Sequence, residues 1–334
     1  MLTIAIDAMG GDVGVDATLP ACAEFLKTYS DVQIVLAGDE NILVELIHKY
    51  NINKQKIQII HTSEVVSMDD SIETALRKKR CSSMRLAIEQ VKHNKASVCV
   101  SSGNTGALMA LSHYLLKPIN GIDRPAIATF IPNQKNQGTV VLDLGANADC
   151  SAQNLLQFAQ MAHVMLGAVS NIQFPTIGLL NIGEEAMKGN EVVKQAGILL
   201  KQSSLNFYGN VEGNDIFKGT TDIVVCDGFM GNIALKSAEG AAKMINNIIK
   251  QSFKQNLYSR ILGAICYPVL KSIKNKVDHR RYNGAMLLGL NGLVIKSHGS
   301  ADSFAFLHAL KYAYEASKHN MINHMQEVFN PTNN

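Results

Sequence analysis

The chain has 334 residues, of which 47% are apolar and 18% are charged, and its formal net charge is +3. This composition excludes a disordered chain, a collagen-like repeat and a small disulfide scaffold, and the balanced charge gives no reason to expect nucleic acid as a partner. The six cysteines are too far apart for a CxxC pair, which is typical of a reducing compartment. The N-terminal residues do not resemble a signal peptide, and no run approaches ~20 apolar residues. We therefore expect a soluble, cytoplasmic protein.

Short β-rich segments alternate with segments of helical periodicity along the chain. The pattern predicts strands at Leu2–Asp7, Val32–Ala37, Lys56–His61, Ser97–Ser101, Ala126–Ile131, Gly138–Asp143, Thr176–Leu180, Leu205–Val211 and Asp222–Cys226. It predicts helices at Asp16–Tyr29, Glu40–Tyr50, Ser82–Asn94, Ala152–Ala168, Asn190–Gln202 and Asn232–Gln251, and a last one that opens at Asp302. Several of the strands are apolar on both faces, so we expect a doubly wound α/β fold with helices on both sides of a mostly parallel sheet. No linker or repeat interrupts the pattern, which predicts a single domain over residues 1–334.

Clusters of Gly, Asn, Asp and Ser follow the predicted strands. They are Asp7–Asp12, Ser102–Gly106, Asp143–Asn147, Asn181–Asn190, Asp227–Asn232 and Ser297–Asp302. Ligands of open α/β sheets bind beyond the carboxyl ends of the strands, so we expect the six clusters to share one sheet edge. Glycine lets a backbone approach a ligand closely, and helix N-termini attract anions, which together favour a phosphate site. Each cluster taken alone is more typical of an ordinary turn or helix cap, and only the six together favour a ligand site.

Several established motifs are absent from the sequence. The phosphate loop GxxxxGK[ST] does not occur, and the glycines between Gly284 and Gly292 have the wrong spacing for a dinucleotide fingerprint. A GxSxG nucleophile turn is also missing, so a covalent enzyme intermediate is not indicated. The residues call for no metal and no cofactor.

Three candidate positions each allow more than one interpretation. Lys188 follows Glu184 and Glu185, and can form an ion pair with them or contact phosphate. His298 precedes a glycine and a helix start, which suits a general acid, a general base or an oxyanion donor. The serines that follow Lys79 and Arg80, among them Ser83, can cap a helix or contact phosphate.

The clusters, taken together and in this order, are similar to the PlsX family, the acyl-ACP:phosphate acyltransferases of bacterial phospholipid synthesis. The motifs that carry the resemblance are DAMGGD (7–12), KKRCSSM (78–84), SSGNTGA (101–107), LDLGANADC (142–150), GEEAMKGN (183–190), GFMGNIALK (228–236), GAMLLGLNG (284–292) and KSHGSAD (296–302). They cover essentially the whole chain. One departure is Ser102, which stands where the family's motif is expected to have alanine.

The resemblance implies transfer of a long-chain acyl group from acyl carrier protein (ACP) to inorganic phosphate, giving an acyl phosphate. A downstream membrane acyltransferase would then use that product to acylate glycerol 3-phosphate. The resemblance also implies a fold related to phosphate acetyltransferases and isocitrate dehydrogenases. It further implies a homodimer that associates peripherally with an anionic membrane surface.

Roles for the candidate residues follow from this chemistry, in which phosphate must be held in line with a thioester and the oxyanion needs donors. We expect Lys188, Asn104 and Asn232 to hold phosphate or the oxyanion, and His298 to polarise the carbonyl or protonate the leaving thiolate. Asp143 and Asn147 would organise their surroundings. The remaining expected phosphate or substrate contacts are Asp7, Gly10, Gly11, Ser83, Thr105, Glu184, Asp227, Gly231 and Ser300.

Residues 250–281 contain eight basic residues and one acidic residue, which gives this segment a local net charge of +7. Apolar residues recur at helical spacing, and Pro268 should end the first helix before a second stripe that includes Ile273 and Val277. Such a segment is typical of a helix in a membrane interface, although dimer packing and docking of acidic ACP remain open. The expected contact residues are Lys254, Leu257, Arg260, Ile261, Lys271 and Lys274.

Two rival functions remain. A phosphate acetyltransferase would share the fold and the phosphate site but use a CoA thioester. A non-catalytic membrane scaffold would bind lipid and show no turnover. A dehydrogenase is a weaker candidate than either of these two functions, because the dinucleotide fingerprint is missing.

Overall fold

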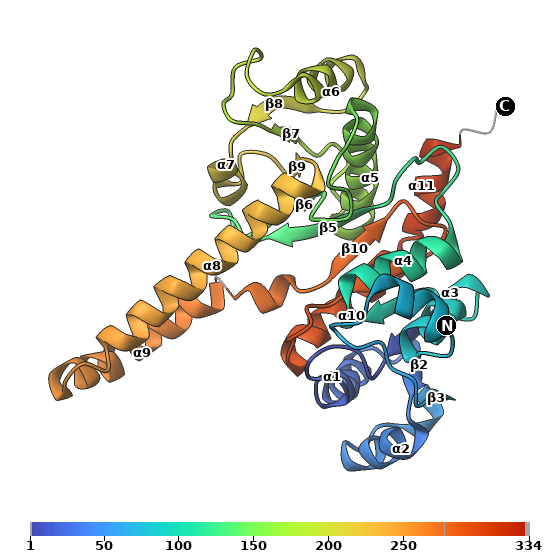
Figure 1. Cartoon of the computed structure of the whole chain (residues 1–334). Coiled ribbons are helices and arrows are strands. Elements are labelled where there is room, and N and C mark those ends of the chain that lie inside the picture. Colours follow the sequence, from blue (N-terminus) through green and yellow to red (C-terminus); the bar gives the residue numbers. More distant parts are fainter. Residues whose placement is uncertain (1, 277, 331–334) are drawn as a thin grey trace.

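A single mixed sheet forms the centre of the computed structural model, which describes residues 2–276 and 278–330 (Figure 1). Within these residues the sheet has eleven strands in the order β3-β2-β1-β4-β11-β10-β5-β6-β9-β7-β8. The strands are β1 (Leu2–Asp7), β2 (Val32–Gly38), β3 (Ile57–His61), β4 (Val98–Ser101), β5 (Ala126–Ile131), β6 (Thr139–Leu142), β7 (Ile177–Leu180), β8 (Phe207–Val211), β9 (Ile223–Val225), β10 (Ala285–Leu288) and β11 (Leu293–Lys296).

The strands run in two directions. β3, β2, β1, β4 and β11 are parallel to one another, and β6, β9, β7 and β8 form a second parallel group. Between the groups, β10 is antiparallel to both β11 and β5, and β5 is antiparallel to β6. The carboxyl ends of the two parallel groups therefore lie at opposite edges of the sheet.

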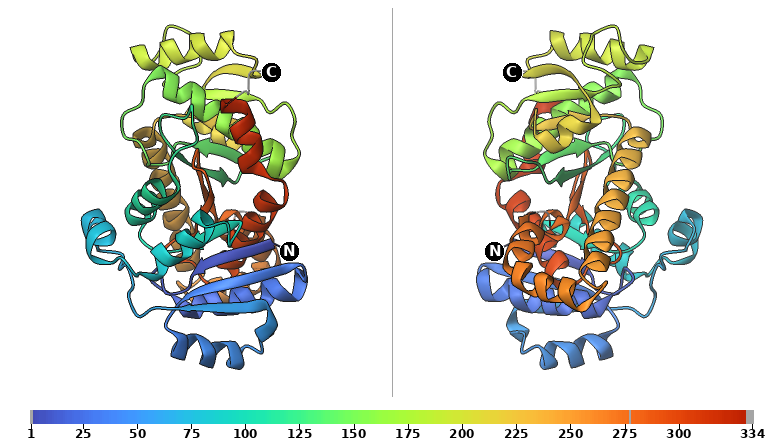
Figure 2. Two further views of the ribbon diagram at one scale, coloured as in Figure 1. Left: turned by 90° about the vertical axis from the view of Figure 1, so that its right-hand side faces the viewer. Right: turned by 90° about the vertical axis from the view of Figure 1, so that its left-hand side faces the viewer.

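Helices cover both faces of the sheet (Figure 2). The α-helices are α1 (Val15–Thr28), α2 (Glu40–Lys49), α3 (Ser83–Lys92), α4 (Thr105–Leu116), α5 (Ala152–Ser170), α6 (Glu191–Gln202), α7 (Gly213–Lys218), α8 (Gly228–Ser252), α9 (Leu257–Lys276), α10 (Ser303–Lys318) and α11 (Met321–Phe329). Single turns are η1 (Lys54–Lys56), η2 (Thr74–Lys78) and η3 (His279–Tyr282). Buried side chains of α1, α2, α5, α10 and α11 pack on one face, and those of α3 and α4 pack on the other.

α8 and α9 extend away from the body of the molecule (Figure 1). α8 runs outward from the end of β9, and α9 leads back toward η3. Residues 240–276 are called the arm below. The side chains of Met244, Ile248, Leu257, Ile261 and Ile265 on the arm are all more than half exposed. Within the described residues, no helix is both long and apolar enough to cross a bilayer.

The predicted fold class is confirmed, and the predicted bounds of Leu2–Asp7 and Ala126–Ile131 match β1 and β5. The break at Pro268 was wrong, because α9 continues through that proline from Leu257 to Lys276. An interior proline removes one backbone hydrogen bond, and in an exposed helix water can solvate the carbonyl that loses its partner. Val277, placed in the second apolar stripe, lies outside the described residues.

Candidate active site

The expectation that all six polar clusters share one sheet edge was wrong. The turns after β1, β4 and β11 lie at one edge, and those after β6, β7 and β9 lie at the other. The reversal comes from the hairpin of β5 and β6, which pairs Ile131 with Thr139. The two antiparallel pairings of β10, with β11 and with β5, cancel each other, so β5 still runs parallel to β11. The two predicted strands at Ala126–Ile131 and Gly138–Asp143 had no helix between them, and this spacing was the signal for a hairpin.

At the first edge, Asp7 lies buried at the end of β1 and joins three elements. Its Oδ1 accepts a hydrogen bond from Ser83 Oγ at 2.6 Å, and its Oδ2 accepts one from Ser101 Oγ at 2.7 Å. Burial raises the pKa of Asp7, although the two hydroxyls oppose that effect. Ser83 therefore acts neither as a cap nor as a free anion contact here, because its hydroxyl is used to hold Asp7.

The turns at this edge pack closely on one another at two glycines. A Cβ on Gly10 would lie 2.3 Å from Asp7 Oδ2, and a Cβ on Gly11, whose φ is +88°, would lie 2.7 Å from Ser102 Oγ. The Ser102 hydroxyl donates to the Gly10 carbonyl at 2.7 Å, and the amide of Asp12 donates to the Gly299 carbonyl at 2.8 Å. The hydroxyl of Ser102, which stands where alanine was expected, thus has a hydrogen-bond partner that alanine would lack.

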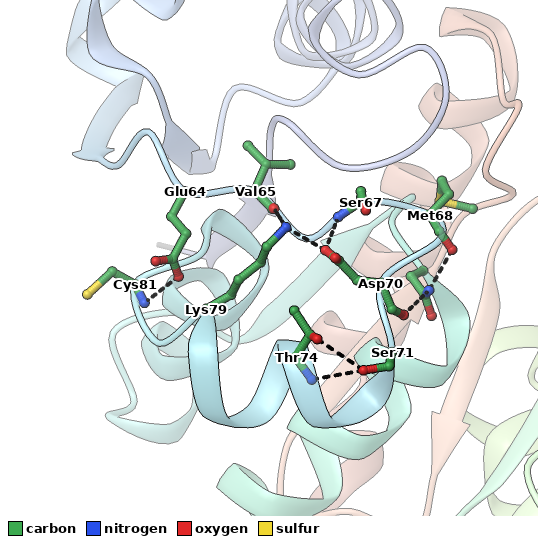
Figure 3. A network of polar contacts seen from close by, with 10 residues as sticks. Glu64, Val65, Ser67, Met68, Asp70, Ser71, Thr74, Lys79 and Cys81 are labelled. Atoms are coloured by element: carbon green, nitrogen blue, oxygen red, sulfur yellow. Dashed lines mark hydrogen bonds and ion pairs between the residues drawn. The ribbon is translucent and has the colours of Figure 1, made fainter.

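Asn104 attaches the loop of residues 62–82, whose own polar contacts are drawn in Figure 3, to this edge. Its Nδ2 donates to the carbonyls of Met68 at 2.7 Å and Asp70 at 3.2 Å, while its Oδ1 caps α4 by accepting from the Ala107 amide. Within the loop, Lys79 donates to the Asp70 carboxylate, and this contact lowers the pKa of Asp70. The Asn104 amide is thus fully engaged with protein partners, and Thr105 begins the helix beside it.

His298 lies in the turn between β11 and α10, and its ring orientation is set by Ser300. The Ser300 amide donates to His298 Nδ1 at 3.2 Å, and Ser300 Oγ lies 3.0 Å from the same nitrogen. Partial removal from water, with nearby lysines, lowers the pKa of His298. A neutral ring that accepts at Nδ1 carries its proton on Nε2, so His298 presents a hydrogen-bond donor at that atom.

At the second edge, Asp143 is buried and holds its own turn together. It accepts from the amides of Ile127 at 3.0 Å, Ala146 at 3.1 Å and Asn147 at 2.7 Å, and also from Asn147 Nδ2. Burial raises the pKa of Asp143, with these donors opposing it. Asp143 and Asn147 therefore hold this turn together, and their expected role beside a substrate stays a prediction.

The start of α8 packs directly on this turn. Asp227 caps the helix through Oδ1, which accepts from the Met230 amide at 2.8 Å. A Cβ on Gly231 would lie 1.9 Å from the Asp143 carbonyl oxygen, so a side chain at this position would push α8 away. Asn232, one residue on, is exposed and lies against Gly145.

Lys188 lies in the turn after β7, beside the turn after β9, and is exposed. Among the described residues it forms no ion pair with Glu184 or Glu185, both of which are also exposed. The structure thus places Lys188, Glu184, Asp227, Gly231 and Asn232 at the second edge. It places Asp7, Gly10, Gly11, Ser83, Asn104, Thr105, His298 and Ser300 at the first edge.

α8 connects the two edges. It starts at the second edge, and Lys236 lies roughly 12 Å further along the helix axis than Gly228. Lys236 is near enough to lower the pKa of both His298 and Lys296, whose own turns lie at the first edge. Because Asn232 and Lys236 are four residues apart, they share one face of α8. The two sets of turns are therefore linked by one helix.

Sequence reasoning gave no role to Lys236, Lys296 or Asn283, and it did not foresee the ion pair of Asp70 with Lys79. Asn283 accepts from the His298 amide at 2.9 Å and donates to Ser297 Oγ at 2.8 Å, so it fixes the histidine turn. A signal for Lys296 was present, because this lysine directly follows the apolar run LVI of a strand buried on both faces. A charged residue in such a position is unusual and points to a specific role.

The family described as "Fatty acid synthesis protein" matches residues 2–324. A "Phosphate acyltransferase" of Polynucleobacter asymbioticus is 59% identical over 329 residues, covering 98% of each chain. One of Delftia acidovorans is 56% identical over 330 residues, covering 98% of this chain and 94% of the relative.

Two solved structures share the fold. The EutD phosphotransacetylase from Staphylococcus aureus has a TM-score of 0.61 at 16% identity and covers 94% of this chain and 93% of its own. A phosphotransacetylase from Streptococcus pyogenes has a TM-score of 0.59 at 18% identity, and the match covers 98% of this chain and 94% of the phosphotransacetylase. Both identities are low, so these likenesses establish the fold only. The family match and the close relatives establish more: the chain belongs to the PlsX family of fatty acid synthesis proteins and is a phosphate acyltransferase.

Proposed function

We propose that this acyltransferase moves a long-chain fatty acyl group from acyl carrier protein to inorganic phosphate, and so produces an acyl phosphate for phospholipid synthesis. The observation that carries the proposal is the joining of two glycine-rich edges by α8. The starts of α4 and α10 lie with Lys296 at the first edge, near Lys236, and the start of α8 lies with Lys188 at the second edge. Helix N-termini and lysines both attract an anion.

In the proposed reaction, a phosphate oxygen attacks the thioester carbonyl and forms the new C–O bond. The C–S bond then breaks, and the ACP thiolate leaves and takes up a proton. His298 suits this step because its Nε2–H can donate to the carbonyl oxygen or to the departing sulfur. Asn232 and Lys188 hold the phosphate or the oxyanion, while Asp7, Asp143 and Asn147 keep the turns in place.

The deciding experiment measures release of free thiol from long-chain acyl-ACP, with and without phosphate. The proposal expects release only when phosphate is present, and not from acyl-CoA. Release from acyl-CoA alone would favour the acetyltransferase-like rival, and release from neither donor would favour a non-catalytic scaffold. Lys188→Ala should reduce turnover and leave the fold intact. An unchanged rate and an unchanged phosphate KM in this variant would remove Lys188 from the site.

The arm suits contact with an anionic membrane, as part of the same proposal. Leu257, Ile261, Ile265 and Val269 recur every four residues on α9, and each is more than half exposed. Exposed Lys254, Arg260 and Lys271 accompany them, and Lys274 follows on the same helix. Such a combination favours a helix in the membrane interface, next to a membrane acyltransferase that consumes the acyl phosphate. The same surface can serve homodimer packing or ACP docking.

Charge reversal separates these roles. Lys254→Glu with Lys271→Glu should weaken sedimentation with liposomes rich in anionic lipid, while Lys92→Glu with Lys95→Glu, on the exposed end of α3 and after it, should not. Light scattering on the same variants reports the oligomeric state. Unchanged liposome binding together with dissociation of a dimer would assign the arm to dimer packing. A raised KM for acyl-ACP alone would assign it to carrier docking.

A further inference from the structure

Lys296 is a buried lysine at the end of β11, in the middle of the sheet. Only 7% of the residue is exposed, and its partner on the neighbouring strand β4 is Ser101. Its ammonium donates to the Ser102 carbonyl at 3.3 Å and to the carbonyl of Ser297. One side chain thus joins the turn that leads to Asn104 with the turn that carries His298.

The charge of this ammonium is poorly balanced by its surroundings. In the described part of the chain Lys296 forms no ion pair, and the ammonium spends two of its three N–H donors on carbonyls. Burial lowers the pKa of Lys296 to about 8, Lys236 acts in the same direction, and the carboxylates of Asp7 and Asp12 only partly oppose it. A buried cation of this kind costs free energy, and an apolar side chain of similar shape is often neutral or stabilising. Stability alone therefore gives little reason for a lysine here.

We propose that Lys296 is a positioning residue for the phosphate substrate: it fixes the two turns relative to each other, and its positive charge favours the dianion between them. This inference rests on the proposed function, because it takes phosphate as the anion. The geometry supports it, since Ser102 and Ser297 directly precede the segments that begin α4 and contain His298. Loss of the charge would weaken phosphate binding even where the turns stay in place.

The pH profile distinguishes this role from a structural one. The charged groups facing Lys296 are Asp7 on β1, Asp12 after β1, His298 after β11 and Lys236 on α8. Burial lowers the pKa of His298 below its ordinary value, so this histidine cannot produce an alkaline limb near pH 8. A Lys296 variant tests whether Lys296 itself produces the limb.

The test measures kcat and the phosphate KM for wild type, Lys296→Met and Lys296→Arg between pH 6.5 and 9.5. Wild type should lose kcat/KM for phosphate above about pH 8. In Lys296→Met, the phosphate KM should rise by about tenfold at pH 7.5 and the alkaline limb should disappear. Lys296→Arg keeps the charge and should move the limb to higher pH.

Lys56→Met is a matched control, because Lys56 also donates to a backbone carbonyl, that of Ser30 at 2.6 Å, but at the outer end of the sheet. It should change neither KM nor the profile. A Lys296→Met enzyme with wild-type phosphate KM, or one that keeps the alkaline limb, would overturn the proposal. If neither variant folds, a wild-type profile without a limb near pH 8 would overturn it. A wild type that never transfers an acyl group to phosphate would instead overturn the proposed function itself, and this inference with it.

Discussion

Arg280 donates a hydrogen bond from Nη1 to Asp302 Oδ2 at 2.6 Å, and this contact joins η3, which follows the arm, to the N-cap residue of α10. The same guanidinium binds Asp278 through Nε at 2.9 Å and Nη2 at 2.7 Å. Asp302 also caps α10, since its Oδ1 accepts from the Ala305 amide. The chain segment that returns from the arm is therefore held next to the His298 turn.

We expect Arg280→Ala to lower the free energy of unfolding by about 2 kcal/mol, because it removes charge-assisted hydrogen bonds to two carboxylates. Urea denaturation measures the effect. Arg77→Ala provides the comparison, since Arg77 and Glu73 form a pair in which both side chains are more than two-thirds exposed. That change should stay within about 0.5 kcal/mol of wild type. An equal loss of unfolding free energy in the two variants would show that the Arg280 contacts stabilise the protein no more than an exposed ion pair does.

Two glycines of α8 should respond oppositely to alanine. Gly231→Ala would place a Cβ 1.9 Å from the Asp143 carbonyl oxygen, so we expect a loss of about 3 kcal/mol and a displaced start of α8. Gly240→Ala meets no atom within 4 Å on an exposed helix, and should stabilise the protein by about 0.5–1 kcal/mol. Thermal unfolding of the pair checks both signs. A tolerated Gly231→Ala would contradict the close packing of α8 on the Asp143 turn.

Asn104→Ser should release the loop of residues 62–82 without removing the cap of α4. Serine can still accept from the Ala107 amide, but it lacks the Nδ2 that donates to Met68 and Asp70. We expect faster hydrogen exchange at loop amides such as that of Ser67, and unchanged exchange in the middle of α4. Unchanged exchange in the loop would mean that the ion pair of Asp70 and Lys79 suffices to hold it.

The buried Asp7 should make stability depend on pH in a direction unusual for a carboxylate. Burial raises its pKa above the ordinary 3.8, so the folded protein keeps this proton at pH values where the unfolded chain has lost it. The stabilising contribution is full below pH 3.8 and is lost as the pH rises through the folded value. The unfolding free energy of wild type minus that of Asp7→Asn should therefore fall as the pH rises from about 4. A difference that grows with pH would show that the Ser83 and Ser101 hydroxyls outweigh burial.

The sequence predicted single elements better than their relative directions. Apolar runs such as Ile4–Ala5–Ile6 are buried on both faces, so local pattern defined β1 well. The strands β10 and β11 were missed because glycines and an asparagine in GLNG made their segment look like a loop motif. Strand direction depends on which segments pair across more than a hundred residues, and no local periodicity encodes that choice.

In the candidate site, too, local contacts could be predicted better than contacts between residues that are far apart in the sequence. The organising role predicted for Asp143 and Asn147 rests on residue type and motif, and the contacts that Asp143 makes lie mostly within its own turn. The engagement of Asn104 with Met68 depends instead on a loop 36 residues earlier in the chain. Such a partner cannot be identified without the fold, and neither can the contact of Lys296 with Ser102, which spans 194 residues.

The central position of β10 and β11 has a consequence for how the chain folds. These strands, made from residues 285–296, separate β4 from β5, whose residues precede them by more than 150 positions. Until this late segment is synthesised, β4 and β5 each present an unpaired edge, and the two parallel groups have no common backbone ladder. Pairing that waits for distant residues slows folding, and open edges invite contact with other chains. We therefore expect the joining of the two parallel groups to be one of the last steps of folding. It must be completed before the turns that carry His298 and Asn104 can meet.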